Sequence, residues 1–214
     1  MLDKIIQTAR DTNKQILILA APRTGTHALG QEIAVLSGAK NFGEICMTGY
    51  CDDPWQDIHS LIDCKVFAVG HVVQLTPKMV LAENVEKIKK RCVLVNIKRQ
   101  DLVSQFASWM YFRVLDPTGL HGWYNHSKQK TRLQPGQIVA KKEDIDQFKL
   151  EQMLDEYFFP DFRLCYETMN FSQQKLYQKN QFSFPLPQMF SNLDFVQQQL
   201  GTWKFTSAHL GQNE

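Results

Sequence analysis

Two structural patterns meet in the stretch LILAAPRTGTHAL, residues 17–29, and together they decide the fold. Residues 15–20 form an apolar run, which is typical of a strand buried on both faces of a parallel sheet. Residues 26–36 then take up an apolar pattern at helical spacing, and we expect this helix to end near Gly38. The loop between them, residues 22–26, is small and hydroxylated and carries one arginine.

The rest of the chain continues this alternation of strands and helices. Further apolar runs at residues 65–69, 92–97 and 161–166 predict three more strands. The alternation predicts an α/β fold with three layers, α/β/α, around a mostly parallel central sheet. In such sheets ligands bind beyond the carboxyl ends of the strands, where the loop after the first strand lies. Amphipathic spacing predicts helices at residues 2–11, 26–36, 78–90, 101–113, 143–157, 171–179 and 191–200.

The length and composition fit one domain that spans residues 1–214. Apolar residues make up 43% of the chain and charged residues 21%, as in an ordinary globular protein. Residues 114–142 show little periodicity and contain Pro, Gly, Trp, His and several Lys, so we expect a functional loop or lid there. Asp101 stands at the start of a predicted helix, where its carboxylate is expected to cap the N-terminus.

Charge and cysteine content narrow the class of protein. A net charge of +2 is too small to predict nucleic-acid binding, so any anion site must be local. The five cysteines are odd in number and form no CxxC pair, which argues against disulfides and a structural zinc site and for a reducing compartment. The charged N-terminus lacks the apolar core of a signal peptide, and no run approaches the roughly 18 apolar residues of a membrane span. We therefore expect a soluble, cytoplasmic protein.

The loop at residues 22–26 has the composition of an anion site. A helix that starts there presents unpaired N–H groups and the positive end of its dipole. Gly25 allows close approach of the backbone, and Arg23 adds a permanent forked charge. Thr24 and Thr26 add hydroxyl groups. The alternative is a plain strand–helix turn with a solvated Arg23. The loop is not a Walker A motif, because the glycine spacing and the terminal Gly-Lys-Ser/Thr are missing.

A second candidate for anion binding follows the strand at residues 92–97. Lys98 and Arg99 end this strand, and Ser104 and Ser108 share one face of the next helix because they are four residues apart. A strand-end arginine and a helix serine could hold a second phosphate from two sides. The alternative is a solvated basic pair with two ordinary helix serines.

Together these segments resemble the sulfotransferases that use PAPS, 3′-phosphoadenosine 5′-phosphosulfate. AAPRTGTHAL resembles their 5′-phosphosulfate loop, and IKRQDLVSQFASW resembles their 3′-phosphate motif. FGEIC, RLCYETM and FVQQQLG resemble three further elements of the family, in the right order. The resemblance covers roughly residues 16–201 and is closest to the compact bacterial Stf0-like branch. It implies a P-loop-like sulfotransferase fold.

The resemblance also implies a reaction and a donor site. A sulfuryl group would pass from PAPS to a hydroxyl or amine of a small-molecule or carbohydrate acceptor, leaving PAP, without a metal ion. Arg23 would stabilise the charge that grows on the leaving 5′-phosphate. Arg99 and Ser108 would hold the 3′-phosphate, with Lys98 as the alternative to Arg99. The remaining donor contacts would come from the loop and the first helical turn: Thr24, Gly25, Thr26 and His27.

The acceptor must lose a proton, so the reaction needs a base. Glu44, in FGEIC, matches the carboxylate proposed as base in bacterial and Golgi-type relatives. His71 follows a predicted strand and resembles the histidine base of cytosolic relatives. Glu44 is the preferred base, with His71 in the pocket. The alternatives to the whole interpretation are a P-loop-like small-molecule kinase and a non-catalytic nucleotide-binding protein of the same fold.

Overall fold

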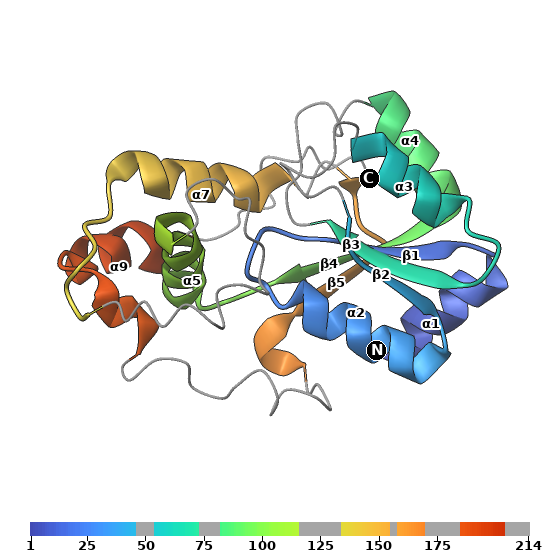
Figure 1. Ribbon diagram of the computed structural model, residues 1–214, viewed down its shortest axis with the longest axis horizontal. Helices are drawn as coiled ribbons and strands as arrows, with labels where there is room; N and C mark the ends of the chain where they lie inside the picture. Colours follow the sequence, from blue (N-terminus) through green and yellow to red (C-terminus); the bar gives the residue numbers. More distant parts are fainter. Residues whose placement is uncertain (46–53, 73–81, 116–133, 155–157, 170–184, 204–214) are drawn as a thin grey trace.

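The computed structural model describes residues 1–45, 54–72, 82–115, 134–154, 158–169 and 185–203. Its centre is a five-stranded sheet in the order β2-β3-β1-β4-β5, in which every pair of neighbouring strands is parallel (Figure 1). This confirms the predicted α/β fold with a parallel central sheet. The strands are β1 (Gln15–Leu19), β2 (Lys40–Glu44), β3 (Ala68–Val72), β4 (Cys92–Lys98) and β5 (Phe162–Cys165).

Helices cover both faces of this sheet. The side chains of β1 alternate between the faces: Ile16 and Ile18 pack with α1 and α2, whereas Leu17 and Leu19 pack with α3 and α4. Figure 1 shows these two helix pairs on opposite sides of the strands. All four side chains are fully buried, which explains the apolar run that predicted the strand. The covering helices are α1 (Leu2–Asp11), α2 (Thr26–Ser37), α3 (Pro54–Ile62) and α4 (Ala82–Arg91).

A third hydrophobic cluster lies beyond the end of β4, among α5, α7 and α9 (Figure 1). Phe106 of α5 is its centre: the ring is fully buried and lies 5.3–5.7 Å, between centroids, from Trp109, Phe148 and Phe190. This cluster packs α5 against α7 and α9 beyond the end of β4, which positions the side chains at the start of α5. The three helices are α5 (Leu102–Leu115), α7 (Lys142–Leu154) and α9 (Leu193–Gly201).

The order of strands places the loop after β1 at the middle of the sheet. β1 pairs with β3 on one side and β4 on the other, with Leu19 opposite Val72 and Asn96. The chain crosses from β3 over β1 to β4, so the sheet reverses its winding direction at β1. A ligand site is expected at such a point, beyond the carboxyl ends of the strands.

Several predicted boundaries differ from the structure. The strand expected at residues 65–69 begins three residues later, as β3, and the chain also forms β2 and α3, which the apolar pattern did not indicate. The helix expected at 171–179 lies outside the described residues. Of the expected lid at 114–142, the first two residues end α5 and residues 134–142 are described; Ile138 there makes a parallel bridge to Phe190. In the described part of the chain, no helix combines the length and apolar character needed to cross a membrane.

Candidate functional site

The loop after β1 has the backbone of an anion-binding turn. Arg23 has a φ of 69° and Gly25 a φ of 94°, so two left-handed residues alternate with Thr24 just before α2 begins. Such alternation turns successive N–H groups toward one point and creates a concavity suited to anions. A left-handed arginine is uncommon, and strain of this kind concentrates at functional sites. Gly25 is the N-cap of α2, so the open N–H groups of the first helical turn face the same region.

Gly25 is also required by the packing above it. A Cβ atom at this position would lie 2.5 Å from two ring atoms of Tyr166, well inside contact distance. Tyr166 follows β5, and the guanidinium carbon of Arg99 lies 4.7 Å from the centre of its ring. Tyr166 therefore contacts both Gly25 and Arg99, and joins the loop after β1 to the ends of β4 and β5.

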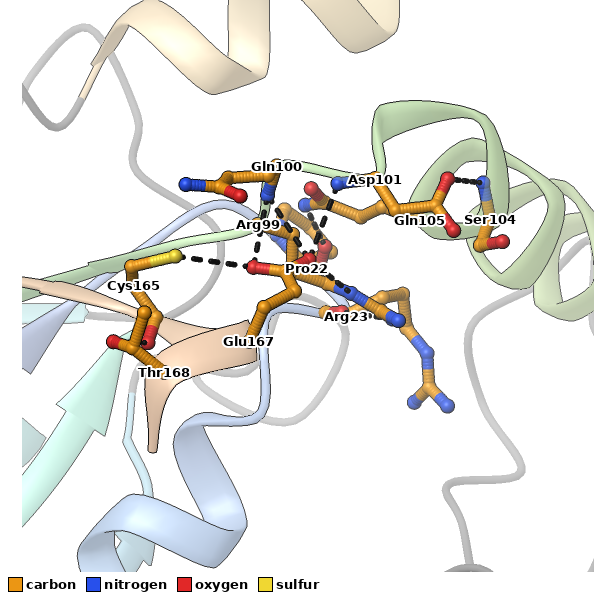
Figure 2. A network of polar contacts seen from close by, with 10 residues as sticks. All are labelled: Pro22, Arg23, Arg99, Gln100, Asp101, Ser104, Gln105, Cys165, Glu167 and Thr168. Atoms are coloured by element: carbon orange, nitrogen blue, oxygen red, sulfur yellow. Dashed lines mark hydrogen bonds and ion pairs between the residues drawn. The ribbon is translucent and has the colours of Figure 1, made fainter. Parts of the chain in front are cut away.

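A hydrogen bond to α5 fixes the side chain of Arg23. Its Nε donates a hydrogen bond to Ser108 Oγ at 2.9 Å, and its backbone oxygen accepts one from Arg99 Nη1 at 3.4 Å. Gln105 Nε2 donates to the oxygen of Pro22 at 2.8 Å, which fixes the loop to the same helix (Figure 2). Burial lowers the pKa of Arg23 to about 10, with the Glu44 carboxylate opposing this change and Arg99 adding to it. The guanidinium is still charged at neutral pH.

The two predicted anion motifs thus meet at one place. Arg99 and Ser108 both contact Arg23, one through its backbone and the other through its side chain. Lys98 is the alternative to Arg99. Its ammonium group donates a hydrogen bond to the backbone oxygen of Gln152 in α7 at 2.8 Å. Ser104 lies at the first turn of α5, where its N–H donates to the Asp101 carboxylate at 2.9 Å, so the predicted cap is confirmed.

The carboxylate of Glu167 binds the backbone just before α5 begins. It accepts hydrogen bonds from the backbone N–H groups of Gln100 and Asp101 at 3.0–3.1 Å and from Cys165 Sγ at 3.2 Å (Figure 2). Its Oε1 lies 3.9 Å from Arg99 Nε. Glu167 therefore supports Arg99 and the strand end, and the only signal for this role in the sequence was its place in RLCYETM.

The hydrogen bonds of Glu167 predict a pH-dependent contribution to stability. Partial burial alone would raise its pKa, but the bonds from Gln100, Asp101 and Cys165 outweigh this and hold the pKa below the ordinary 4.5. A lowered pKa in the folded state means that the stabilisation is present above pH 4.5 and lost as pH falls through the folded value. We expect Glu167→Gln to lower the free energy of unfolding by about 1 kcal/mol at pH 7, because the group is partly exposed.

Urea unfolding of wild type and Glu167→Gln at pH 7, 5 and 3 would check this expectation. The difference between the two proteins should shrink at the lowest pH. Glu86→Gln, which changes an exposed acid of α4, is the matched control and should show no such trend. A difference for Glu167→Gln that stays constant from pH 7 to pH 3 would contradict the assignment.

A second group of predicted residues meets beside α2. His27 Nε2 lies 3.3 Å from Glu44 Oε2, and the rings of His27 and His71 are 4.3 Å apart in an edge-to-face arrangement. His27 belongs to the first turn of α2, Glu44 ends β2, and His71 lies opposite Glu44 in β3. The sequence placed each residue near the site but gave no indication that all three come together.

The two candidate bases, Glu44 and His71, differ in solvent exposure. His71 is only 1% exposed, and burial lowers its pKa to about 3, with His27 adding to the effect. The imidazole of His71 is therefore neutral at pH 7. The Glu44 side chain is 19% exposed and the His27 side chain 49%, so these two form the accessible rim of the group. The negative charge of Glu44 also raises the pKa of Arg23, so the carboxylate lies near the loop after β1.

A cavity of about 670 Å³ adjoins Arg99 on the side of β5 and α9. Its volume lies in the usual range for small-molecule sites. The cavity is lined by residues from the ends of β4 and β5, the start of α5 and the end of α9. They include Lys98, Arg99, Asp101, Cys165, Leu200 and Trp203.

Two aromatic side chains of α5 are buried in the hydrophobic cluster around Phe106. Trp109 and Tyr111 are 5% and 8% exposed, so they are not available as the wall of an acceptor site. Trp109 Nε1 donates to Glu151 Oε2 at 2.9 Å, which satisfies its one polar group.

No family model matches the chain, and no curated protein sequence matches it either. Among solved structures, the chain is similar to that of mouse sulfotransferase SULT7A1 complexed with PAP, with 16% sequence identity and a TM-score of 0.38. The similarity covers 96% of this chain and 66% of the mouse protein, so the chain spans about two thirds of that protein's length. At this level of similarity, the function must be inferred from the residues of the site.

Proposed function

We propose that the chain is a sulfotransferase that moves a sulfuryl group from PAPS to a hydroxyl or amine of a small-molecule or carbohydrate acceptor. The observation that carries the proposal is the convergence of Arg23, Arg99 and Ser108 on a strained anion-binding loop at the middle of a parallel sheet. The Stf0-like branch and the cytoplasmic location remain predictions from the sequence.

The loop after β1 would bind the 5′-phosphosulfate. Its N–H groups and the N-terminus of α2 supply donors and a partial positive charge. Thr24 is fully buried and its hydroxyl donates to the oxygen of Ala21 at 3.0 Å, so it would contribute its backbone N–H. Gly25 permits the close approach, and Thr26 and His27 would contact the phosphosulfate from the first turn of α2.

The 3′-phosphate would bind at Arg99 and Ser108. Arg99 faces both the loop and the adjoining cavity, whose volume suits the nucleoside. Ser108 Oγ accepts from Arg23 and keeps its own proton to donate to a phosphate oxygen. The contact of Lys98 with Gln152 favours Arg99 as the phosphate ligand. Two anchored phosphates would fix the orientation of the donor, which is a large part of the rate enhancement in transfer reactions.

Transfer would proceed in line. The bond between sulfur and the leaving 5′-phosphate oxygen breaks while a bond forms between sulfur and the acceptor oxygen or nitrogen, and PAP departs. Arg23 and the loop N–H groups would stabilise the charge that grows on the leaving oxygen. The acceptor proton passes to Glu44, whose carboxylate is accessible. The buried His71 would pack behind Glu44 and support the pocket.

The kinase alternative is not favoured, because the loop has no Walker lysine and no terminal Gly-Lys-Ser/Thr. A non-catalytic nucleotide-binding protein would bind PAP and show no turnover with any acceptor, so an acceptor screen with labelled PAPS separates it from an enzyme.

We expect PAP to bind, and Arg99→Ala to weaken binding by about tenfold to a hundredfold, because a charged hydrogen-bonded contact to the 3′-phosphate is lost. Calorimetric titration with PAP, 5′-AMP and ATP-magnesium measures this directly. Binding of 5′-AMP should be weak and unaffected by the substitution.

Lys98→Ala is the matched control and should change PAP affinity less than threefold, within about 0.6 kcal/mol. A preference for ATP-magnesium, or equal effects of Lys98→Ala and Arg99→Ala, would contradict the assignment of the 3′-phosphate site.

A further inference from the structure

His27, Glu44 and His71 form a cluster of metal-binding donor types. Each offers one ligand atom, and the three atoms lie within 4.8 Å of one another. The residues come from three separate elements, the first turn of α2 and the strands β2 and β3. The strands are joined at this point, since Glu44 pairs with His71 and the N–H of Ile45 donates to the oxygen of His71 at 2.9 Å. The backbone positions are therefore fixed before any ligand binds.

The spacing of the donors fits a small divalent ion. His27 Nε2 and Glu44 Oε2 are 3.3 Å apart. Two ligands of a tetrahedral zinc ion, at bond lengths of about 2.0–2.2 Å, lie roughly 3.3–3.5 Å apart. The rings of His71 and His27 lie 4.3 Å apart, between centroids, in an edge-to-face arrangement, so the third donor adjoins this pair.

An independent observation at His71 points to a ligand. This side chain is 1% exposed, and neither ring nitrogen has a hydrogen-bond partner among the described residues. Buried polar atoms are normally satisfied by protein, water or an ion, because an unpaired one costs free energy. A metal ion bound to one nitrogen would satisfy that atom, and the accessible rim formed by His27 and Glu44 gives an ion a path to it.

We propose that His27, Glu44 and His71 form a binding site for a divalent transition metal such as Zn²⁺, with the fourth position open toward the loop after β1. Two imidazoles and one carboxylate are a common ligand set for zinc, cobalt and related ions. The positive charge of Arg23 lies close to Glu44 and opposes a cation there, so bonds to the imidazole nitrogens must supply much of the affinity. Magnesium and calcium, which need oxygen ligands, would bind poorly.

The consequence for activity rests on the proposed function, whereas the metal site itself does not. A bound metal ion would occupy Glu44, the group proposed to accept the acceptor's proton. Zn²⁺ would therefore inhibit sulfuryl transfer, and a chelator would restore it.

Titration of the metal-free full chain, after removal of any affinity tag, with Co²⁺ would test the site by visible absorption. We expect one equivalent of Co²⁺ to give the intense bands of a four-coordinate ion, and Zn²⁺ to displace it. His27→Ala and Glu44→Gln should each weaken binding by more than about tenfold. Both side chains are accessible, so neither substitution is expected to prevent folding. His59→Ala, which removes an exposed histidine of α3, is the matched control and should bind Co²⁺ as wild type does.

Weak bands of a six-coordinate ion, or binding that is unchanged in both His27→Ala and Glu44→Gln, would overturn the proposal. PAP titration of the same samples in the presence of a chelator keeps the two proposals distinct. In the wild-type chain, an absence of Co²⁺ binding with intact PAP binding would contradict only the metal site. Co²⁺ binding without PAP binding would contradict only the sulfotransferase.

Discussion

Arg23→Ala is expected to lower the turnover of sulfuryl transfer by about 10²–10³-fold, the usual effect of removing one preorganised group that stabilises transition-state charge. Arg23 meets the conditions for such an effect. Its side chain is half-buried, its Nε is fixed by Ser108, and it stands on the loop where the leaving phosphate oxygen would lie. A charge held in place needs no reorganisation during the reaction.

Arg23→Lys is the informative companion variant. Both substitutions keep a Cβ atom at the left-handed position, so the backbone cost is the same in both. Lysine keeps the charge but loses the forked geometry and the Nε bond to Ser108. We expect Arg23→Lys to retain more turnover than Arg23→Ala. Steady-state kinetics with labelled PAPS, after circular dichroism confirms folding, measures both. Turnover within threefold of wild type in Arg23→Ala would contradict the role.

Glu44→Gln is expected to lower turnover by at least about 10²-fold while PAP affinity stays within threefold of wild type, because a general base acts only on the acceptor. The amide has nearly the same shape as the carboxylate but cannot take the proton. Assays in the presence of a chelator exclude any effect of metal ions bound to this residue. A loss of PAP binding equal to the loss of turnover would show that Glu44 supports the donor site.

His71 offers the comparison that separates the two candidate bases. We expect His71→Asn to lower turnover less than Glu44→Gln does, since His71 is 1% exposed and cannot reach an acceptor without rearrangement. Thermal melting of both variants keeps a folding defect distinct from a chemical one. The opposite ranking, with a folded His71→Asn, would assign the proton transfer to the histidine.

The central part of the fold could be predicted because its signals are local. β1 is buried on both faces, so its apolar run is continuous, and Gly38 ends α2 in the left-handed conformation expected of a helix C-cap. The strand predicted at 65–69 was placed too early because Gly70 and His71 interrupt the apolar run. A Cβ at Gly70 would lie 3.3 Å from Leu61 Cδ2, so tertiary packing explains that glycine.

β2 escaped prediction because it is an edge strand of mixed character. Its sequence, KNFGE, is mostly polar, and its register with β3 shifts between Asn41 and Glu44, where Gly43 has a φ of 68°. Neither feature produces a regular alternation of apolar residues. Edge strands are often protected in this way against pairing with other chains.

The candidate site was predictable only in part, because some of its residues belong to sequence motifs and others come together only through strand pairing. Arg23, Arg99 and Ser108 belong to motifs whose order places them at adjacent strand ends, so their proximity follows from the parallel sheet. The group of His27, Glu44 and His71 depends on the pairing of β2 with β3, which no local pattern revealed. The sequence therefore showed no metal-ligand cluster, although its three donors were each named as site residues.

The two contacts of Tyr166, with Gly25 and with Arg99, have a consequence for how the chain tolerates substitution. One aromatic ring touches the backbone of the first anion loop and the side chain proposed to hold the second phosphate. The relative position of these two proposed phosphate contacts would thus depend on where a single ring lies. A substitution at position 166 would alter both contacts together, so compensation would require coordinated changes at positions 25 and 99, which lie far apart in the chain.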